Sequence, residues 1–210
     1  MKTSVIIPVK TFQKSKTRLH LSEDKTKDLC RLLLEEVIKT INKIKLIDKI
    51  IVVTNEEQVL DIIKKYDCEK IQDKYETSVN DAVKLAEKYL IDNEFTHSIV
   101  LPLDVPFFYS EDLEELLKFS SDGSVVIVPS RHFDGTNALV RTPINSMTPR
   151  YDEGSYSFQI ESAKKDDVKI SIGLIYRLML DIDNTKDLEF VLKQNIKPEF
   201  CEKIRRIIER

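Results

Sequence analysis

Short apolar runs separated by amphipathic stretches are the feature that most constrains how this 210-residue chain can fold. The runs at residues 3–8, 49–54 and 98–103 are rich in isoleucine and valine, which is typical of strands buried on both faces of a sheet. After the first run, Ser22 and the acids behind it predict the start of a long helix, because they satisfy free amides and the helix dipole. This strand–helix rhythm predicts an α/β fold with a largely parallel sheet covered on both faces.

The same patterns predict the remaining elements. Further strands are expected at residues 69–72, 124–128, 137–141, 168–172 and 177–182, and helices at 56–66, 79–90, 157–165, 185–194 and 198–210. Ser110 is expected to cap one more helix, and residues 142–155 are expected to form a loop over the sheet. No repeat or linker interrupts the chain, so residues 1–210 are predicted to form a single domain.

The charge balance excludes some classes of ligand. The chain has 33 lysines and arginines against 36 acidic residues, a net charge of −3, which disfavours nucleic-acid or anionic-membrane binding. An anionic substrate must therefore be held by local cations or by a metal. The three cysteines are far apart, no signal peptide is visible, and no apolar run approaches the roughly 18 residues of a membrane span. We therefore expect a soluble, cytoplasmic protein.

A cationic loop directly follows the first predicted strand. Residues 8–19 read P-V-K-T-F-Q-K-S-K-T-R-L and include Lys10, Lys14, Lys16 and Arg18. Ligands in open α/β sheets bind at the carboxyl ends of the strands, so this loop could neutralise a triphosphate. A solvated basic loop is the alternative, and the glycines of a Walker A loop are absent.

Aspartates follow two other apolar segments. Asp104 lies between two prolines in L-P-L-D-V-P, and a stiff backbone of this kind suits a carboxylate that binds a hard cation such as Mg²⁺. Asp181 and Asp183 alternate with apolar residues, so on a strand both would point to the same face. Capping of the next turn or helix is the alternative in each case. A nucleoside triphosphate with its metal would explain the loop and both groups of aspartates together.

These segments resemble the 2-phospho-L-lactate guanylyltransferase family. The family's I-P-V-K, A-K-S-R-L and P-A-D-L-P motifs are similar to residues 7–10, 15–19 and 102–106. Its G-G-T-N-A-L, G-x-x-S-F and L-D-V-D-T-P-E-D-L motifs are similar to residues 134–139, 154–158 and 180–188, where Lys186 replaces the proline. The similarity runs from the first strand to about residue 190.

The resemblance implies a Rossmann-like nucleotidyltransferase fold of the nucleotide-diphospho-sugar transferase type, with a mostly parallel mixed sheet. It also implies a reaction in which GTP and 2-phospho-L-lactate give lactyl-2-diphospho-5′-guanosine and pyrophosphate, in coenzyme F-420 biosynthesis. Some relatives use phosphoenolpyruvate or 3-phosphoglycerate as the acceptor. A nucleotidyltransferase with another base or acceptor, and a non-catalytic nucleotide-binding regulator, are the alternatives. The expected partners are thus GTP and a small phosphorylated carboxylic acid, and a homodimer is one of the oligomeric states left open.

The resemblance and the residue chemistry together assign the candidate site. Lys16, Arg18 and Asp104 are expected to be catalytic, and Asp104 and Asp183 to bind Mg²⁺. The acceptor is expected to contact Thr136, Asn137, Gly154 and Ser157. The nucleotide is expected to contact Pro8, Val9, Lys10, Lys16, Arg18, Ser78, Asn80 and Asp104.

Overall fold

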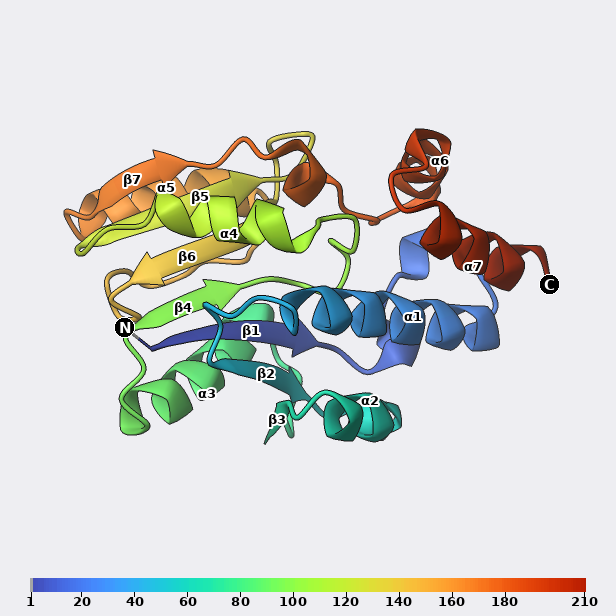
Figure 1. Ribbon diagram of the computed structural model, residues 1–210, viewed down its shortest axis with the longest axis horizontal. Coiled ribbons are helices and arrows are strands. Elements are labelled where there is room, and N and C mark those ends of the chain that lie inside the picture. Colours follow the sequence, from blue (N-terminus) through green and yellow to red (C-terminus); the bar gives the residue numbers. More distant parts are fainter. Residues whose placement is uncertain (1) are drawn as a thin grey trace.

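The computed structural model describes residues 2–210, whose strands form one seven-stranded sheet in the order β3-β2-β1-β4-β6-β5-β7 (Figure 1). The strands are β1 Thr3–Val9, β2 Lys49–Thr54, β3 Glu69–Gln72, β4 His97–Val100, β5 Ser124–Pro129, β6 Thr136–Thr142 and β7 Lys169–Ile172. Strand β1 pairs in parallel with both β2 and β4, while β6 runs antiparallel to β4 and β5. The carboxyl ends of β1, β2 and β4 therefore meet at one edge of the sheet.

Helices cover both faces of this sheet. They are α1 Glu23–Ile41, α2 Leu60–Lys65, α3 Val79–Asp92, α4 Ser110–Lys118, α5 Ser155–Lys165, α6 Thr185–Gln194 and α7 Pro198–Glu209. One buried apolar cluster joins the sheet to α1, α2, α4, α6 and α7, and a second joins the opposite face to α3 and α5. The predicted α/β class with a mostly parallel mixed sheet is therefore confirmed. None of the described helices is both long and apolar enough to cross a bilayer.

Two helix starts differ from the prediction. Ser22 caps α1 as expected and accepts a hydrogen bond from the Lys25 amide. Ser110, however, is the first residue of α4, and Tyr109 occupies the cap position, where its amide donates to the Asp112 carboxylate over 2.8 Å. The fifth helix begins at Ser155 rather than at residue 157, because Gly154 takes the cap position with φ of +79°. Glycine adopts this left-handed backbone without a steric penalty.

The strand predicted at residues 177–182 is wrong. Residues Tyr176–Met179 form a short 3-10 helix, and the following segment crosses the carboxyl ends of the sheet without joining it as a strand. Its amide at Ile182 donates to the carbonyl of Asp104 over 3.0 Å. Alternating apolar and polar residues fit an edge strand and a crossing segment equally well, which explains the error.

A buried lysine supports the loop that carries Asp104. Lys197 is only 8% exposed, and its ammonium donates to the Pro106 carbonyl and to the Glu36 carboxylate, both over 2.8 Å. Burial lowers the pKa of Lys197, although the attraction of Glu36 opposes this shift. Through this one side chain, the start of α7 is connected to α1 and to the turn after β4.

We predict that Lys197→Ala destabilises the fold by about 2–4 kcal/mol, because it leaves a largely buried carboxylate and a carbonyl without their donor. Urea denaturation measures the change. Lys193→Ala is the matched control, since Lys193 is exposed near the end of α6. Equal stability of the two variants would contradict a supporting role for Lys197.

Candidate active site

A cleft of about 760 Å³ lies at the carboxyl ends of β1 and β4. Segments from both halves of the chain line it: the cationic loop, the turn after β4, the start of β6, the segment before α5, and the crossing segment before α6. The predicted site residues that line this cleft are Pro8, Lys10, Lys16, Arg18, Asp104, Thr136, Asn137, Gly154 and Asp183.

Lys16 joins the two predicted metal ligands. Its ammonium lies 2.7 Å from the Asp104 carboxylate and 3.1 Å from the Asp183 carboxylate, and its side chain is only 9% exposed. Burial disfavours the charged amine, but the attraction of the two carboxylates outweighs it and raises the pKa of Lys16 above its ordinary value. The Lys16 backbone is left-handed, with φ of +54°, which costs a non-glycine residue roughly 1–2 kcal/mol. The ion pairs oppose this cost.

Asp181 is a third carboxylate in this cluster. Burial, followed by repulsion from Asp104 and Asp183, raises its pKa to about 7. The Asn137 amide donates to Asp181 over 3.3 Å and to the Leu178 carbonyl over 3.1 Å, so Asn137 holds this carboxyl group in the cleft. The alternation of Asp181 with Asp183 is visible in the sequence, but Asp181 is not among the predicted site residues. The L-D-I-D pattern was the signal for it.

The negative charge of this cluster exceeds the charge of Lys16. Across residues 2–210, no group of three or more acidic, histidine or cysteine side chains is already arranged as a metal site. The oxygens of Asp104 and Asp183 nevertheless converge on one cation, the Lys16 ammonium. Hard carboxylate oxygens with unbalanced negative charge are the donors that suit a divalent cation such as Mg²⁺.

The cationic loop divides into anchored and free charges. Phe12 is fully buried, and its amide donates to the Glu56 carboxylate over 3.0 Å. Lys14 pairs with Glu76 over 2.8 Å, so its charge is already neutralised. Lys10 and Arg18 are exposed and make no ion pair with any residue from 2 to 210, yet both line the cleft. They are the cations that remain available to phosphate groups.

The opposite wall of the cleft carries neutral hydrogen-bonding groups. Ser155 directly follows Gly154, and its hydroxyl lies 3.1 Å from the hydroxyl of Thr136. Ser157, which was predicted to contact the acceptor, is exposed on α5 and does not line the cleft. Because the helix begins two residues earlier than predicted, the hydroxyl that faces the cleft belongs to Ser155. The neighbouring Gly154 was the signal for this position.

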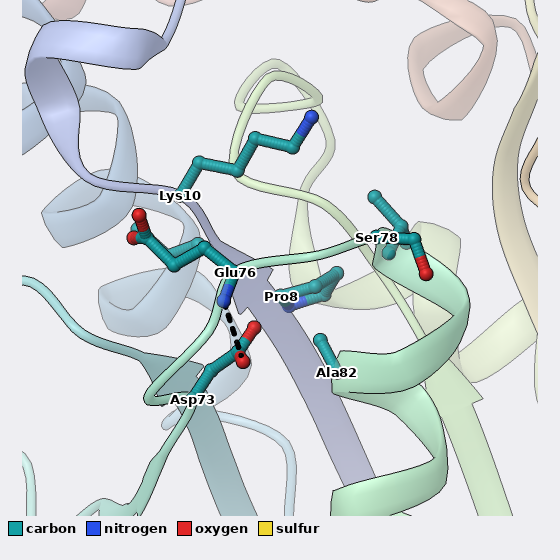
Figure 2. Close-up of a pocket in the computed structure, with 8 residues that line it drawn as sticks. Pro8, Lys10, Asp73, Glu76, Ser78 and Ala82 are labelled. Carbon is teal, nitrogen blue, oxygen red and sulfur yellow. Dashed lines mark hydrogen bonds between the residues drawn. The ribbon is translucent and has the colours of Figure 1, made fainter.

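A smaller pocket adjoins the cleft on the side of β3 and α3, and Pro8, Val9, Lys10 and Ser78 are among its lining residues (Figure 2). The Ser78 hydroxyl also caps α3, accepting from the Asp81 amide over 3.1 Å. Asn80 lines neither cavity, and its side-chain oxygen accepts from the Tyr151 amide over 2.7 Å. The structure thus gives Asn80 the role of tying α3 to the loop before α5.

The mixed α/β sheet carries free cations and clustered carboxylates at its carboxyl edge. The structure is similar to that of a nucleotidyl transferase from Methanothermobacter thermautotrophicus, with a TM-score of 0.68 and 13% identity, over 96% of this chain and 98% of the other. At this identity the similarity establishes the fold.

The family follows from sequence comparison. Residues 3–207 match the family described as guanylyl transferase CofC like, and the chain belongs to this family. It is 31% identical to the 2-phospho-L-lactate guanylyltransferase of Methanocaldococcus jannaschii, over 90% of this chain and 81% of the relative. It is 29% identical to the phosphoenolpyruvate guanylyltransferase of Conexibacter woesei, over 90% of this chain and 86% of that protein.

We predict that Asp181→Asn stabilises the metal-free protein at pH 8 by about 1–3 kcal/mol. Because the folded protein raises the Asp181 pKa to about 7, the ionised carboxylate costs stability above pH 7. Proton uptake by the folded state relieves this cost as the pH falls from 7 towards 4. The advantage of the variant should therefore shrink over that interval.

Urea denaturation in a chelator at pH 8 and pH 4.5 measures this effect. Asp152→Asn is the control, because Asp152 is exposed at the same cleft, and its stability should change by less than about 0.5 kcal/mol. An Asp181→Asn variant with the same advantage at both pH values would show that ionisation of the Asp181 carboxyl group is not the cause.

Proposed function

We propose that this protein transfers GMP from GTP to 2-phospho-L-lactate, giving lactyl-2-diphospho-5′-guanosine and pyrophosphate, a step of coenzyme F-420 biosynthesis. The observation that carries the proposal is the convergence of Lys16, Asp104 and Asp183 in one cleft, beside two cations that make no ion pair with residues 2–210. Family membership supports GTP as the donor. We also propose that the protein works in the cytoplasm, which suits its three unpaired cysteines.

The reaction is a displacement at the α-phosphorus of GTP, in which an acceptor phosphate oxygen forms the new bond and pyrophosphate leaves with the electron pair. The acceptor oxygen is already an anion, so no general base is required. The main obstacle is repulsion between two polyanions, and catalysis then consists of positioning and charge neutralisation. Lys10 and Arg18 would hold the β- and γ-phosphates, while Lys16 would contribute its charge beside the α-phosphate.

The carboxylates suit a magnesium ion. Asp104 and Asp183 would hold it, because their oxygens already converge on one cation, and together with Asp181 they place three carboxyl groups against one lysine in the cleft. When bound, Mg²⁺ would neutralise phosphate oxygens and favour the displacement.

The neutral wall of the cleft supports a small phosphorylated acid as the acceptor. The hydroxyls of Thr136 and Ser155 can donate hydrogen bonds to a carboxylate or a phosphate, and Gly154 lets the backbone approach closely. Phosphoenolpyruvate and 3-phosphoglycerate carry the same two groups, so they are the alternative acceptors. A nucleotide-binding regulator, the alternative from another class, would release no pyrophosphate and would not need both Asp104 and Asp183.

The proposal predicts pyrophosphate release from GTP and Mg²⁺ that depends on 2-phospho-L-lactate and exceeds the rates with phosphoenolpyruvate and 3-phosphoglycerate. A coupled assay with each acceptor, and with CTP and UTP in place of GTP, measures this. Asp104→Asn should lower turnover by about 100-fold or more, while Asp122→Asn, an exposed change on the turn before β5, should not. GTP binding without pyrophosphate release would favour the regulator instead.

We further predict that Thr136→Val and Ser155→Ala raise the KM of the acceptor by about tenfold, because each removes a hydroxyl from the neutral wall. GTP binding, measured by calorimetry, should change little. Ser157→Ala is a control on the same helix, because Ser157 is exposed outside the cleft. Weakened GTP binding with an unchanged acceptor KM would place the two substrates in the opposite halves of the cleft.

A further inference from the structure

Asp73 is a buried carboxylate that lies outside the Lys16 cluster. Asp73 directly follows β3 and is only 7% exposed. Its amide donates to the Thr54 carbonyl over 3.2 Å, and one of its carboxylate oxygens accepts from the Glu76 amide over 3.0 Å. No ion pair to Asp73 occurs within the described chain. Buried aspartates are rarely left without a cation or a full set of donors, so Asp73 has accepting capacity that the fold does not use.

This spare capacity faces a pocket that is continuous with the cleft. Figure 2 shows the carboxylate of Asp73 beside Pro8, with one oxygen bonded to the Glu76 amide. Val9, Val79 and Ala82 supply apolar lining. Pro8, Lys10 and Val79 line both the pocket and the cleft, so one molecule can occupy both. The pocket measures about 20 Å³, room for about one water, so only the edge of a base can enter it while the rest of the ring lies towards the cleft.

We propose that Asp73 selects guanine by accepting hydrogen bonds from its N1–H and its exocyclic amino group. These two donors are adjacent on one edge of guanine, and a carboxylate offers two acceptor oxygens side by side. Adenine presents an acceptor at N1, which would repel the carboxylate. The inference rests on the proposed function, in which GTP is the donor substrate, and it adds the residue that sets base specificity.

A purely structural role for Asp73 makes a different prediction. Glu76 accepts from the Thr11 amide over 2.6 Å and pairs with Lys14, so the turn that Asp73 holds also anchors the cationic loop. If Asp73 served only to hold this turn, its replacement would lower kcat/KM for every nucleoside triphosphate by the same factor. A change in the ranking of the bases separates the two roles.

Asp73→Asn provides this test. The asparagine oxygen can still accept from the Glu76 amide, but the side chain now offers one acceptor and one donor to the base. Xanthine matches that pair, since it keeps N1–H and carries a carbonyl in place of the amino group. We expect kcat/KM for GTP to fall about 100-fold and that for XTP to rise about tenfold, which inverts or removes the preference for GTP.

Two comparisons accompany this measurement. In the wild-type protein, kcat/KM for ITP should be about tenfold lower than for GTP, because hypoxanthine lacks the exocyclic amino group. Glu76→Gln should loosen the same turn and lower kcat/KM for GTP, ITP and XTP by a common factor. Thermal melts of both variants confirm that they fold. Equal losses for GTP and XTP in Asp73→Asn would overturn the assignment.

Calorimetry separates this inference from the proposed function. Suppose that wild-type protein binds GTP and that Asp73→Asn shifts binding towards XTP, but that no acceptor yields pyrophosphate. Asp73 then recognises the base, and only the proposed reaction is wrong. If pyrophosphate is released from GTP but the variant shows no shift towards XTP, the reaction stands and the role of Asp73 is wrong. Wild-type protein that binds neither nucleotide would overturn both.

Discussion

The contact of Lys16 with Asp104 and Asp183 is the interaction on which the site depends. It brings together three segments that are distant in sequence, since Lys16 lies 88 residues from Asp104 and 167 residues from Asp183. Each segment is positioned by the sheet. Lys16 follows β1, Asp104 follows β4, and Asp183 lies on the segment that crosses the same edge. Like charges at this edge would separate these segments if Lys16 did not lie between them.

A second layer of contacts holds the cluster in place. The Asp187 carboxylate accepts from the Asp183 amide over 3.3 Å and pairs with Arg131 over 3.0 Å. On the other side, Lys197 holds the Pro106 carbonyl two residues beyond Asp104. These contacts lie outside the cleft and touch no substrate in the proposed reaction. They maintain a concentration of negative charge that would otherwise be relieved by movement of the loops, which is a common trade between stability and function.

The sequence predicted the sheet well because each central strand is a short apolar run that is recognisable from its own residues. The run at residues 49–54 matches β2 at both ends, since consecutive β-branched residues leave few alternatives to a buried strand. The strand predicted at residues 177–182 was wrong because the spacing of its apolar residues is ambiguous. Its path is decided by the bidentate Arg177–Asp112 contact and by the sheet edge. The position of Asp104 after an apolar strand was predictable from the sequence, but its partner was not, because a contact across 88 residues leaves no local pattern.

The same limit applies to the residues that line the two sides of the cleft. Ser157 and Ser155 are chemically equivalent in the sequence, and only the left-handed backbone of Gly154, which moves the helix start, decides which hydroxyl faces the cleft. Lys10 and Lys14 also look equivalent, yet Glu76 neutralises one and leaves the other free. Composition therefore overstates the charge that the loop offers to a ligand.

In the proposed reaction, the distribution of charge would also orient the substrates. The interior of the cleft carries Asp104, Asp181 and Asp183 against one lysine, whereas Lys10 and Arg18 supply positive charge along the cationic loop. A triphosphate is attracted to the loop and repelled by the carboxylates, unless a divalent cation accompanies it. In the proposed arrangement, the hydrogen-bonding edge of guanine would enter the pocket beside Pro8, and the phosphorylated acid would contact the neutral wall of Thr136 and Ser155. In this arrangement each substrate would be excluded from the other's place by charge or by shape, so the two would lie in one open cleft without competing for the same contacts.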